Sequence, residues 1–382
     1  MKHISLILFS FFIVNAYSQD TIYARQIIKK LTSQEFLGRG YVNDGVNKAA
    51  KFISNELKTI GVSKFGKSYA QFYSFPVNTF PKSMNIILDG KLLIAGKHYL
   101  VYPASQTTKM GVKLVKTNSV TYRATDGFKE LPIQVKLKKK LTYTVETELS
   151  EGTTIELLKD SFPNDLKMMG IMFENKFIPK FTCQNLCGYI KGTQHPDSFI
   201  VLTAHYDHLG AMGKKTYFPG ANDNASGVSV LLNLAKYYKT HPSKYSIAFI
   251  FFSGEEAGLL GSKYYVEHPV FPLSNIKFLT NLDLLGTGDD GIMVVNATVF
   301  KTQFEKLNQL NVDHNYLKQI KQRGKAANSD HYWFAEKGVP SFFIYTMGGI
   351  TAYHDIYDVE KTLPLTKYLE VCKLLIEFNL SL

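Results

Sequence analysis

The spacing of apolar residues changes along the chain, and the first part has a helical pattern. Over residues 21–61, apolar positions recur every three or four residues, at Ile22, Ile27 and Ile28 for example. This periodicity predicts two helices, joined by the glycine-rich connection at 38–45.

Residues 70–180 have a different pattern. Short runs alternate apolar with polar residues, and glycine, proline and asparagine separate them. The runs lie at 86–88, 92–94, 133–137 and 141–145. The pattern predicts short antiparallel strands, so we interpret 70–180 as a β-rich inserted region.

From residue 186 onward, nearly unbroken apolar runs alternate with helical patterns. The runs lie at 199–202, 247–252, 278–282 and 339–345. Such runs are typical of strands buried on both faces, and the spacing over 228–235 predicts a covering helix. The predicted fold class is α/β, with a mostly parallel central sheet covered by helices. In this interpretation, 19–69 and 181–382 form one domain, interrupted by the insertion at 70–180.

The first residues predict an export signal. Lys2 precedes an apolar run at 4–14, and Ala16 and Ser18 place small residues before a cleavage point at Gln19. The apolar run is shorter than the ~20 residues that span a bilayer. We therefore predict a signal peptide at 1–18, a periplasmic or extracellular location, and no transmembrane segment after signal removal.

Composition changes this picture little. The net charge is +12, and much of the lysine excess lies within 109–140. There is no arginine-rich helix or zinc-finger spacing, so we expect a solvated lysine-rich face and no nucleic-acid partner. Cys183, Cys187 and Cys372 leave the disulfide pairing open.

Polar residues gather just after the carboxyl ends of the predicted strands. Open α/β sheets bind ligands in the crevice beyond these ends, so residues ~150 positions apart can meet there. In chain order, the candidates are His205, Asp223, Glu255, Glu256, Asp283 and His354.

Two histidines and three carboxylates from this set suit zinc. We predict two zinc ions per chain, with Asp223 shared between them because its glycine-flanked turn lets the carboxylate reach both. His205 and Asp283 would complete one site, and Glu256 and His354 the other.

The neighbours of these ligands are predicted to support the chemistry. Asp207 lies two residues after His205 in an extended segment, so it can hold the far nitrogen of that imidazole. Glu255, adjacent to a ligand, is the predicted catalytic base. Tyr353 is a candidate donor to the developing oxyanion, with plain packing as the alternative. His208 is expected to be structural.

In this order the motifs resemble metallopeptidase family twenty-eight, the zinc aminopeptidase and glutamate carboxypeptidase type. The matching motifs are the His-x-Asp at 205–207, Asp223 within GANDNASG, the Glu255-Glu256 pair, Asp283 within NLDLLG, and Tyr353-His354. The resemblance covers 186–382 and implies a zinc-exopeptidase fold. Asn222 stands where many members have a second aspartate, and 70–180 has no clear match to the protease-associated domain of some members.

The predicted function is a secreted zinc-dependent exopeptidase acting on peptides or proteins. We predict an aminopeptidase that hydrolyses N-terminal peptide bonds with a two-metal-activated water. A glutaminyl cyclase-like acyltransferase, a carboxypeptidase, for which Arg323 is a candidate carboxylate ligand, and a non-catalytic module are the alternatives. Residues 70–180 contain none of the proposed ligands, so we expect them to shape access and specificity.

Overall fold

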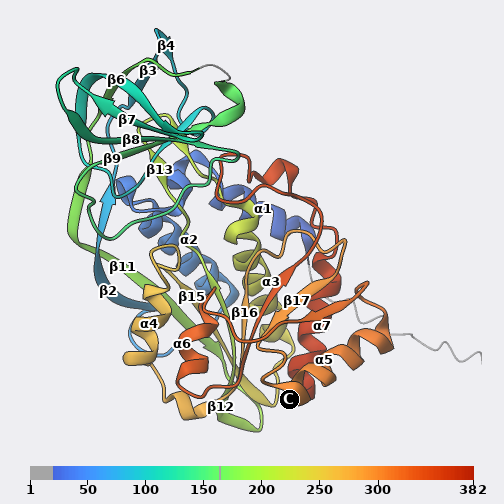
Figure 1. Cartoon of the computed structure of the whole chain (residues 1–382). Coiled ribbons are helices and arrows are strands. Elements are labelled where there is room, and N and C mark those ends of the chain that lie inside the picture. Colours follow the sequence, from blue (N-terminus) through green and yellow to red (C-terminus); the bar gives the residue numbers. More distant parts are fainter. Residues whose placement is uncertain (1–19, 163–164) are drawn as a thin grey trace, which may run out of the picture.

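One large sheet with helices on both faces forms the centre of the fold. The computed structural model describes residues 20–162 and 165–382 (Figure 1). The predicted signal peptide at 1–18 therefore lies outside the described residues.

The larger sheet has nine strands in the order β1-β11-β15-β12-β16-β19-β17-β18, with β2 paired to β11. The strands are β1 (Ser63–Lys64), β2 (Ala70–Thr79), β11 (Lys176–Ile190), β12 (His195–His205), β15 (Tyr245–Phe252), β16 (Ile276–Leu282), β17 (Ile292–Val295), β18 (Ile320–Gln322) and β19 (Ser341–Thr346). β15, β12, β16 and β19 are parallel neighbours, whereas β11 and β17 pair antiparallel on either side. Four parallel strands thus form the centre of the sheet, and β17 and β18 form a second parallel pair at one edge.

Two layers of helices bury the faces of this sheet. Along β12, Ile200 and Leu202 pack into the core on one face, whereas Phe199 and Val201 pack into the core on the other. The first layer contains α1 (Thr21–Leu31), α2 (Gly45–Ile60), α3 (Gly227–Thr240) and α7 (Tyr368–Ser381), with α5 (Lys301–His314) packed against α7. The second contains α4 (Leu260–Glu267) and α6 (His331–Glu336). The α/β fold class is confirmed.

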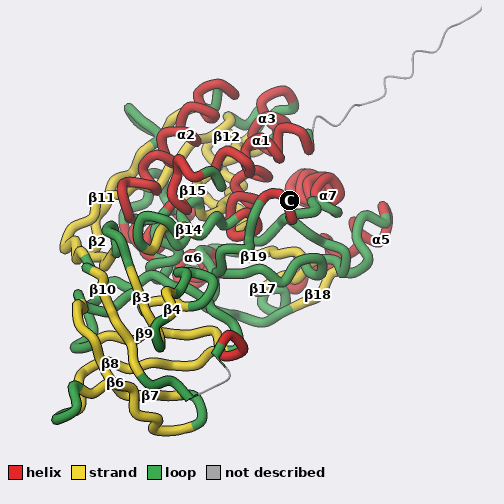
Figure 2. Tube along the Cα trace, turned by 90° about the horizontal axis from the view of Figure 1, so that it is seen from above, coloured by secondary structure: helices red, strands yellow, loops and turns green. Residues whose placement is uncertain are grey.

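A smaller sheet lies beside these layers, at one end of the molecule (Figures 1 and 2). Its order is β4-β3-β10-β6-β7-β8-β9-β5, and it has a separate apolar core. The strands are β3 (Asn85–Leu88), β4 (Lys91–Leu92), β5 (Tyr99–Val101), β6 (Thr108–Asn118), β7 (Thr121–Thr125), β8 (Glu130–Lys138), β9 (Thr153–Leu158) and β10 (Met168–Phe173). A two-stranded ribbon, β13 (Ala211–Met212) and β14 (Thr216–Tyr217), follows β12. The predicted 70–180 region begins and ends with strands of the larger sheet, because β2 pairs with β11.

One local prediction is wrong. The alternating run at 141–145 forms no strand, although Leu141 and Tyr143 are buried. Its side chains alternate as in a strand, but the N–H of Tyr143 donates to the carbonyl of His354 rather than to a strand of the sheet. Ile22 fits the apolar spacing of α1 but is 70% exposed.

Two further features concern the cysteines and the question of a membrane span. Cys183, Cys187 and Cys372 are buried free thiols. Within residues 20–162 and 165–382, no helix has the length and apolar character needed to cross a membrane.

The two isoleucines of α1 provide a test of its packing. Ile28 is fully buried, so Ile28→Ala should destabilise the protein by about 2–5 kcal/mol. Ile22→Ala, on the exposed side of the same helix, should change stability by less than about 0.5 kcal/mol. Urea unfolding midpoints measure both changes. Equal effects of the two substitutions would show that α1 does not pack as described.

Candidate active site

The parallel strands bring the candidate residues together at one edge of the larger sheet. β12 ends at His205, Glu255 follows β15 by three residues, and Asp283 directly follows β16. Because these strands are parallel neighbours, their carboxyl ends lie side by side. Asp223 approaches from the turn of π-helix at Ala221–Ser226, which leads into α3.

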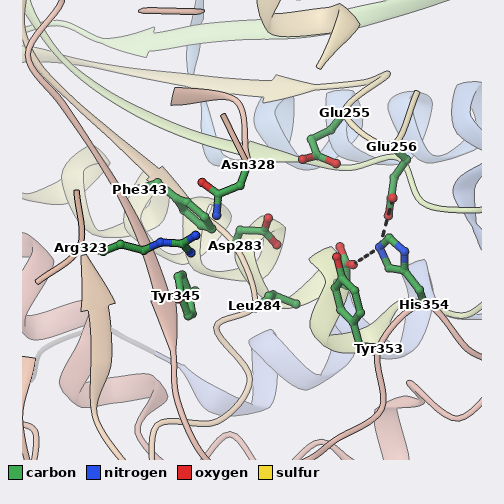
Figure 3. A pocket seen from close by; sticks show the side chains of 11 residues that line it. Glu255, Glu256, Asp283, Leu284, Arg323, Asn328, Phe343, Tyr345, Tyr353 and His354 are labelled. Atoms are coloured by element: carbon green, nitrogen blue, oxygen red, sulfur yellow. Dashed lines mark ion pairs between the residues drawn. The ribbon is translucent and has the colours of Figure 1, made fainter. Parts of the chain in front are cut away.

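A pocket of about 250 Å³ opens at this edge (Figure 3). Its lining residues are Asp223, Glu255, Glu256, Asp283, Leu284, Arg323, Asn328, Phe343, Tyr345, Tyr353 and His354. His205 and Asp207 are fully buried beside it.

Asp223 lies between two pairs of side chains. One carboxylate oxygen, Oδ1, is 3.3 Å from His205 Nε2, and Asp283 Oδ2 is 3.4 Å from the same nitrogen. The other oxygen, Oδ2, is 3.0 Å from His354 Nε2, which is 3.3 Å from Glu256 Oε2. The five predicted ligands therefore meet, and they divide into the two pairs expected around a shared aspartate.

The two adjacent glutamates point in different directions. Glu256 reaches toward His354, whereas the Glu255 carboxylate is turned away from His354 (Figure 3). Burial raises the pKa of Glu255 well above its usual range; the charge of His205 opposes this shift, and that of Glu256 adds to it. Burial thus disfavours the charged form of the Glu255 carboxyl group. A nearby positive charge favours the carboxylate, which can accept a proton.

Asp207 supports the site through its main-chain oxygen and through its carboxylate. His205 Nδ1 is 3.2 Å from the main-chain oxygen of Asp207 but 3.7 Å from its carboxylate. The carboxylate instead accepts hydrogen bonds from Tyr41 Oη at 2.8 Å and from the N–H groups of Glu255 and Glu256 at 3.3 Å each. Asp207 consequently fixes the turn that presents both glutamates.

His208 belongs to the site, although the sequence indicated a structural role. It is fully buried, and its Nδ1 lies 2.7 Å from Glu256 Oε1 and 3.9 Å from Asp223 Oδ1. Strand alternation places it opposite His205, but β12 has ended by this point and the loop turns the ring toward Glu256. His208 is therefore a further nitrogen donor beside His354.

The donor set fits a cation such as zinc. His205 Nε2 and Asp283 Oδ1 are buried and have no hydrogen-bond partner within the described chain. Three groups of residues each place three donor atoms within 4.8 Å of one another. The groups are His205-Asp223-Asp283, His208-Asp223-Glu256 and His205-Glu255-Glu256. Imidazole nitrogens mixed with carboxylate oxygens are the ligands that zinc accepts.

A buried arginine ties the loops of the site to the N-terminal segment. Arg39 is fully buried and donates to the main-chain oxygens of five residues. These are Leu31, Tyr206, Pro219, Gly220 and Asp223, at 2.7–3.2 Å. Burial lowers the pKa of Arg39 to about 10, so it stays charged at neutral pH. The sequence predicted only a glycine-rich connection here, because main-chain acceptors leave no motif.

Two polar residues hold the main chain around Asp223. The carboxylate of Asp358 accepts from the N–H groups of Asn222, at 2.8 Å, and Asp223, at 3.0 Å. Asn222 Oδ1 accepts from the N–H of Gly286 at 2.8 Å, which links this turn to the segment after β16. Asn222, at the position where many members of the resembled family have a second aspartate, thus has a structural contact with Gly286.

Tyr143, in the segment between β8 and β9, contacts His354 twice. The Nδ1 atom of His354 lies 3.1 Å from the carbonyl of Tyr143, and the N–H of Tyr143 donates to the carbonyl of His354 at 2.9 Å. His354 has φ +54°, a conformation that costs a non-glycine residue about 1–2 kcal/mol, and this double contact offsets that cost. Lys140 adds an ion pair with Asp355 at 3.2 Å. The 70–180 region contains no proposed ligand, but it orients one.

A comparison with family models shows to which family the chain belongs. The model of peptidase family M28 matches residues 185–378, just over half of the chain. The chain belongs to peptidase family M28. All five candidate metal ligands of this M28 chain lie within the matched segment.

Individual relatives agree with this assignment. The chain is 36% identical to Aminopeptidase YwaD of Bacillus subtilis over 173 residues, which are 42% of this chain and 35% of that protein. The matches to the first curated relatives thus span about a quarter to a third of their length. The fold is similar to that of BSAP, a zinc aminopeptidase from Bacillus subtilis, with a TM-score of 0.70, 18% identity and 95% of each chain covered. A glutaminyl cyclase from Bacteroides thetaiotaomicron has the same fold, with a TM-score of 0.55, 16% identity and coverage of 96% and 99%.

The stability of this M28 chain should depend strongly on Arg39. Arg39→Met leaves five carbonyl groups without their donor, so we expect a loss of about 3–5 kcal/mol. Arg25→Met removes a half-exposed pair with Glu360 and should cost no more than about 1 kcal/mol. Thermal unfolding compares the two variants. A loss for Arg39→Met as small as that for Arg25→Met would contradict the anchoring role.

Proposed function

We propose that this chain is an exported zinc exopeptidase, an aminopeptidase that cleaves N-terminal peptide bonds with two zinc ions. The observation that supports this most is the position of Asp223, whose two oxygens approach His205 and His354 separately. A carboxylate in this position can be shared by two ions ~3.5–4 Å apart. Family membership favours a peptidase, and the relatives described as aminopeptidases favour this type.

The ligands divide between the two proposed ions. His205, Asp223 and Asp283 would hold one, and Asp223, Glu256 and His354 would hold the other. When bound, the zinc ions supply Lewis acidity, which lowers the pKa of a water molecule and polarises the peptide carbonyl. His208 is a neighbour of Glu256 that can orient the carboxylate.

The residues of the chain then move the proton. Glu255 accepts a proton from the attacking water as the water oxygen bonds to the carbonyl carbon. The carbon–nitrogen bond breaks, and Glu255 returns the proton to the leaving amine. Glu255 lines the pocket and belongs to neither proposed ligand pair, so its carboxyl group can act as the base in the first half of the reaction and as the acid in the second. Tyr353 lines the pocket beside His354 and would donate to the carbonyl oxygen.

Two alternatives on the same fold differ in what they require. A glutaminyl cyclase-like acyltransferase needs a single zinc ion, whereas this site has donors for two. A carboxypeptidase is favoured by one observation, the presence of Arg323 in the pocket wall. Cleavage of substrates blocked at one end or the other distinguishes these activities.

The location and the domain division are also proposals. The pattern at 1–18 supports export to the periplasm or outside the cell. The separate core of the smaller sheet supports 70–180 as an insertion into the catalytic domain formed by 19–69 and 181–382. The contact between Tyr143 and His354 supports a role for this insertion in shaping access to the pocket.

Glu255 and Glu256 form a matched pair that tests the mechanism. Glu255→Gln keeps the side-chain volume but removes the proton acceptor, so kcat should fall by ~10²–10⁴-fold or more. Zinc content should hardly change, because Glu256 remains a ligand. Glu256→Gln should lose zinc as well as activity. Peptide hydrolysis and elemental analysis of both variants measure these effects.

Two results would contradict this assignment. Loss of zinc in Glu255→Gln but not in Glu256→Gln would mean that the two roles are exchanged. Turnover at the parental rate in Glu255→Gln would exclude Glu255 as the base.

A further inference from the structure

We propose that Arg323 makes the pocket a binding site for a carboxylate at the cleaved end of the substrate. The enzyme would then favour peptides whose terminal residue presents an acidic group next to the bond being cut. This inference rests on the proposed peptidase function and adds the chemical class of its substrate.

The position of Arg323 follows from the sheet. It comes directly after β18, and its N–H donates to the carbonyl of Val294 in β17 at 2.8 Å. β18 runs parallel to β17, which pairs antiparallel with β19, and Arg323 lines the pocket together with Phe343 and Tyr345 of β19. The side chain lies on the wall opposite His354 and extends toward the middle of the pocket (Figure 3).

The guanidinium group of Arg323 is available for a ligand. The side chain is exposed, and it makes no hydrogen bond or ion pair to any residue in the described ranges 20–162 and 165–382. Four carboxylates line the same pocket, but none lies within 4 Å of it. Three of them are proposed zinc ligands and the fourth is the proposed base. Arg323 is therefore a positive charge that lines the pocket and has no polar partner among the residues that the structure describes.

The remaining wall around Arg323 supports recognition of a single residue. Leu284, Phe343 and Tyr345 supply apolar surface, Asn328 supplies an amide, and the Phe343 and Tyr345 rings lie 5.3 Å apart. About 250 Å³ is below the ~300–1,000 Å³ of typical ligand pockets, so it suits one terminal residue beside the reacting bond. A carboxylate there can accept two parallel hydrogen bonds from the planar guanidinium and carries the opposite charge, whereas a neutral amide of the same size has one acceptor oxygen and no charge.

Two sources of the carboxylate are chemically equivalent for this site. It can be the side chain of an N-terminal glutamate or aspartate, as suits an aminopeptidase. It can also be the free C-terminal carboxylate, as suits a carboxypeptidase. A pair of substrate series separates them. The first compares glutamyl- with glutaminyl-p-nitroanilide. The second compares N-acetyl dipeptides with free or amidated C-termini.

The test measures kcat/KM on both series for the zinc-loaded full chain. The variants are Arg323→Gln, which removes the charge, and Arg323→Glu, which reverses it. Lys321→Gln is the matched control, because this exposed cation lies two residues away but outside the pocket lining. We expect the native chain to favour the acidic member of one series by roughly tenfold or more, as expected for a charged hydrogen-bonded pair. Arg323→Gln should bring that ratio close to one, and Arg323→Glu should favour a lysyl substrate.

The outcomes separate this inference from the proposed function. An acidic preference in either series that Arg323→Gln removes and Lys321→Gln retains supports the carboxylate site and identifies its source. Cleavage without an acidic preference, or a preference that survives Arg323→Gln, overturns the site but leaves the peptidase intact. No cleavage of any substrate by the zinc-loaded native chain overturns both.

Discussion

The crowding of carboxylates at one edge of the larger sheet is the constraint on which the site depends. Asp223, Glu255, Glu256 and Asp283 all line one pocket of about 250 Å³. Burial raises the pKa of both Glu255 and Asp283, whereas contacts with His205 and His354 hold the pKa of Asp223 low. Buried charges of one sign persist only when cations or donors compensate them. The carboxylates of this pocket therefore require a positive charge close to them.

Segments distant in the sequence hold the loops that carry these carboxylates and histidines in place. Arg39 binds the loops after β12 and before α3, and Asp207 fixes the turn of the two glutamates. Tyr143, from the segment between β8 and β9, orients His354 from the other side. These contacts use main-chain groups to a large extent, so they define positions without requiring a particular neighbour side chain. Ligands fixed in this way lose little freedom when an ion binds, and the affinity benefits accordingly.

The sequence predicted the parts of this arrangement that depend on pattern and residue type. Unbroken apolar runs at 247–252 and 278–282 identified central strands, and the fold class follows from them. His205 and Asp283 were found because parallel strands end at a common edge. Arg39 and Tyr143 were not found, because each acts on or through main-chain atoms, which have no sequence signature. His208 was missed because strand alternation stops where β12 ends, and the direction of the following loop depends on its contacts with Glu256.

The sharing of Asp223 between two ions is the central claim, and the number of bound zinc ions tests it most directly. The native chain and Asp223→Asn would be loaded with zinc, dialysed against metal-free buffer and analysed for metal per folded chain. The account predicts two zinc ions in the native chain and a loss at both positions in Asp223→Asn, because each pair of ligands shares this carboxylate. One ion or none in the native chain, or two ions retained in Asp223→Asn, would contradict it.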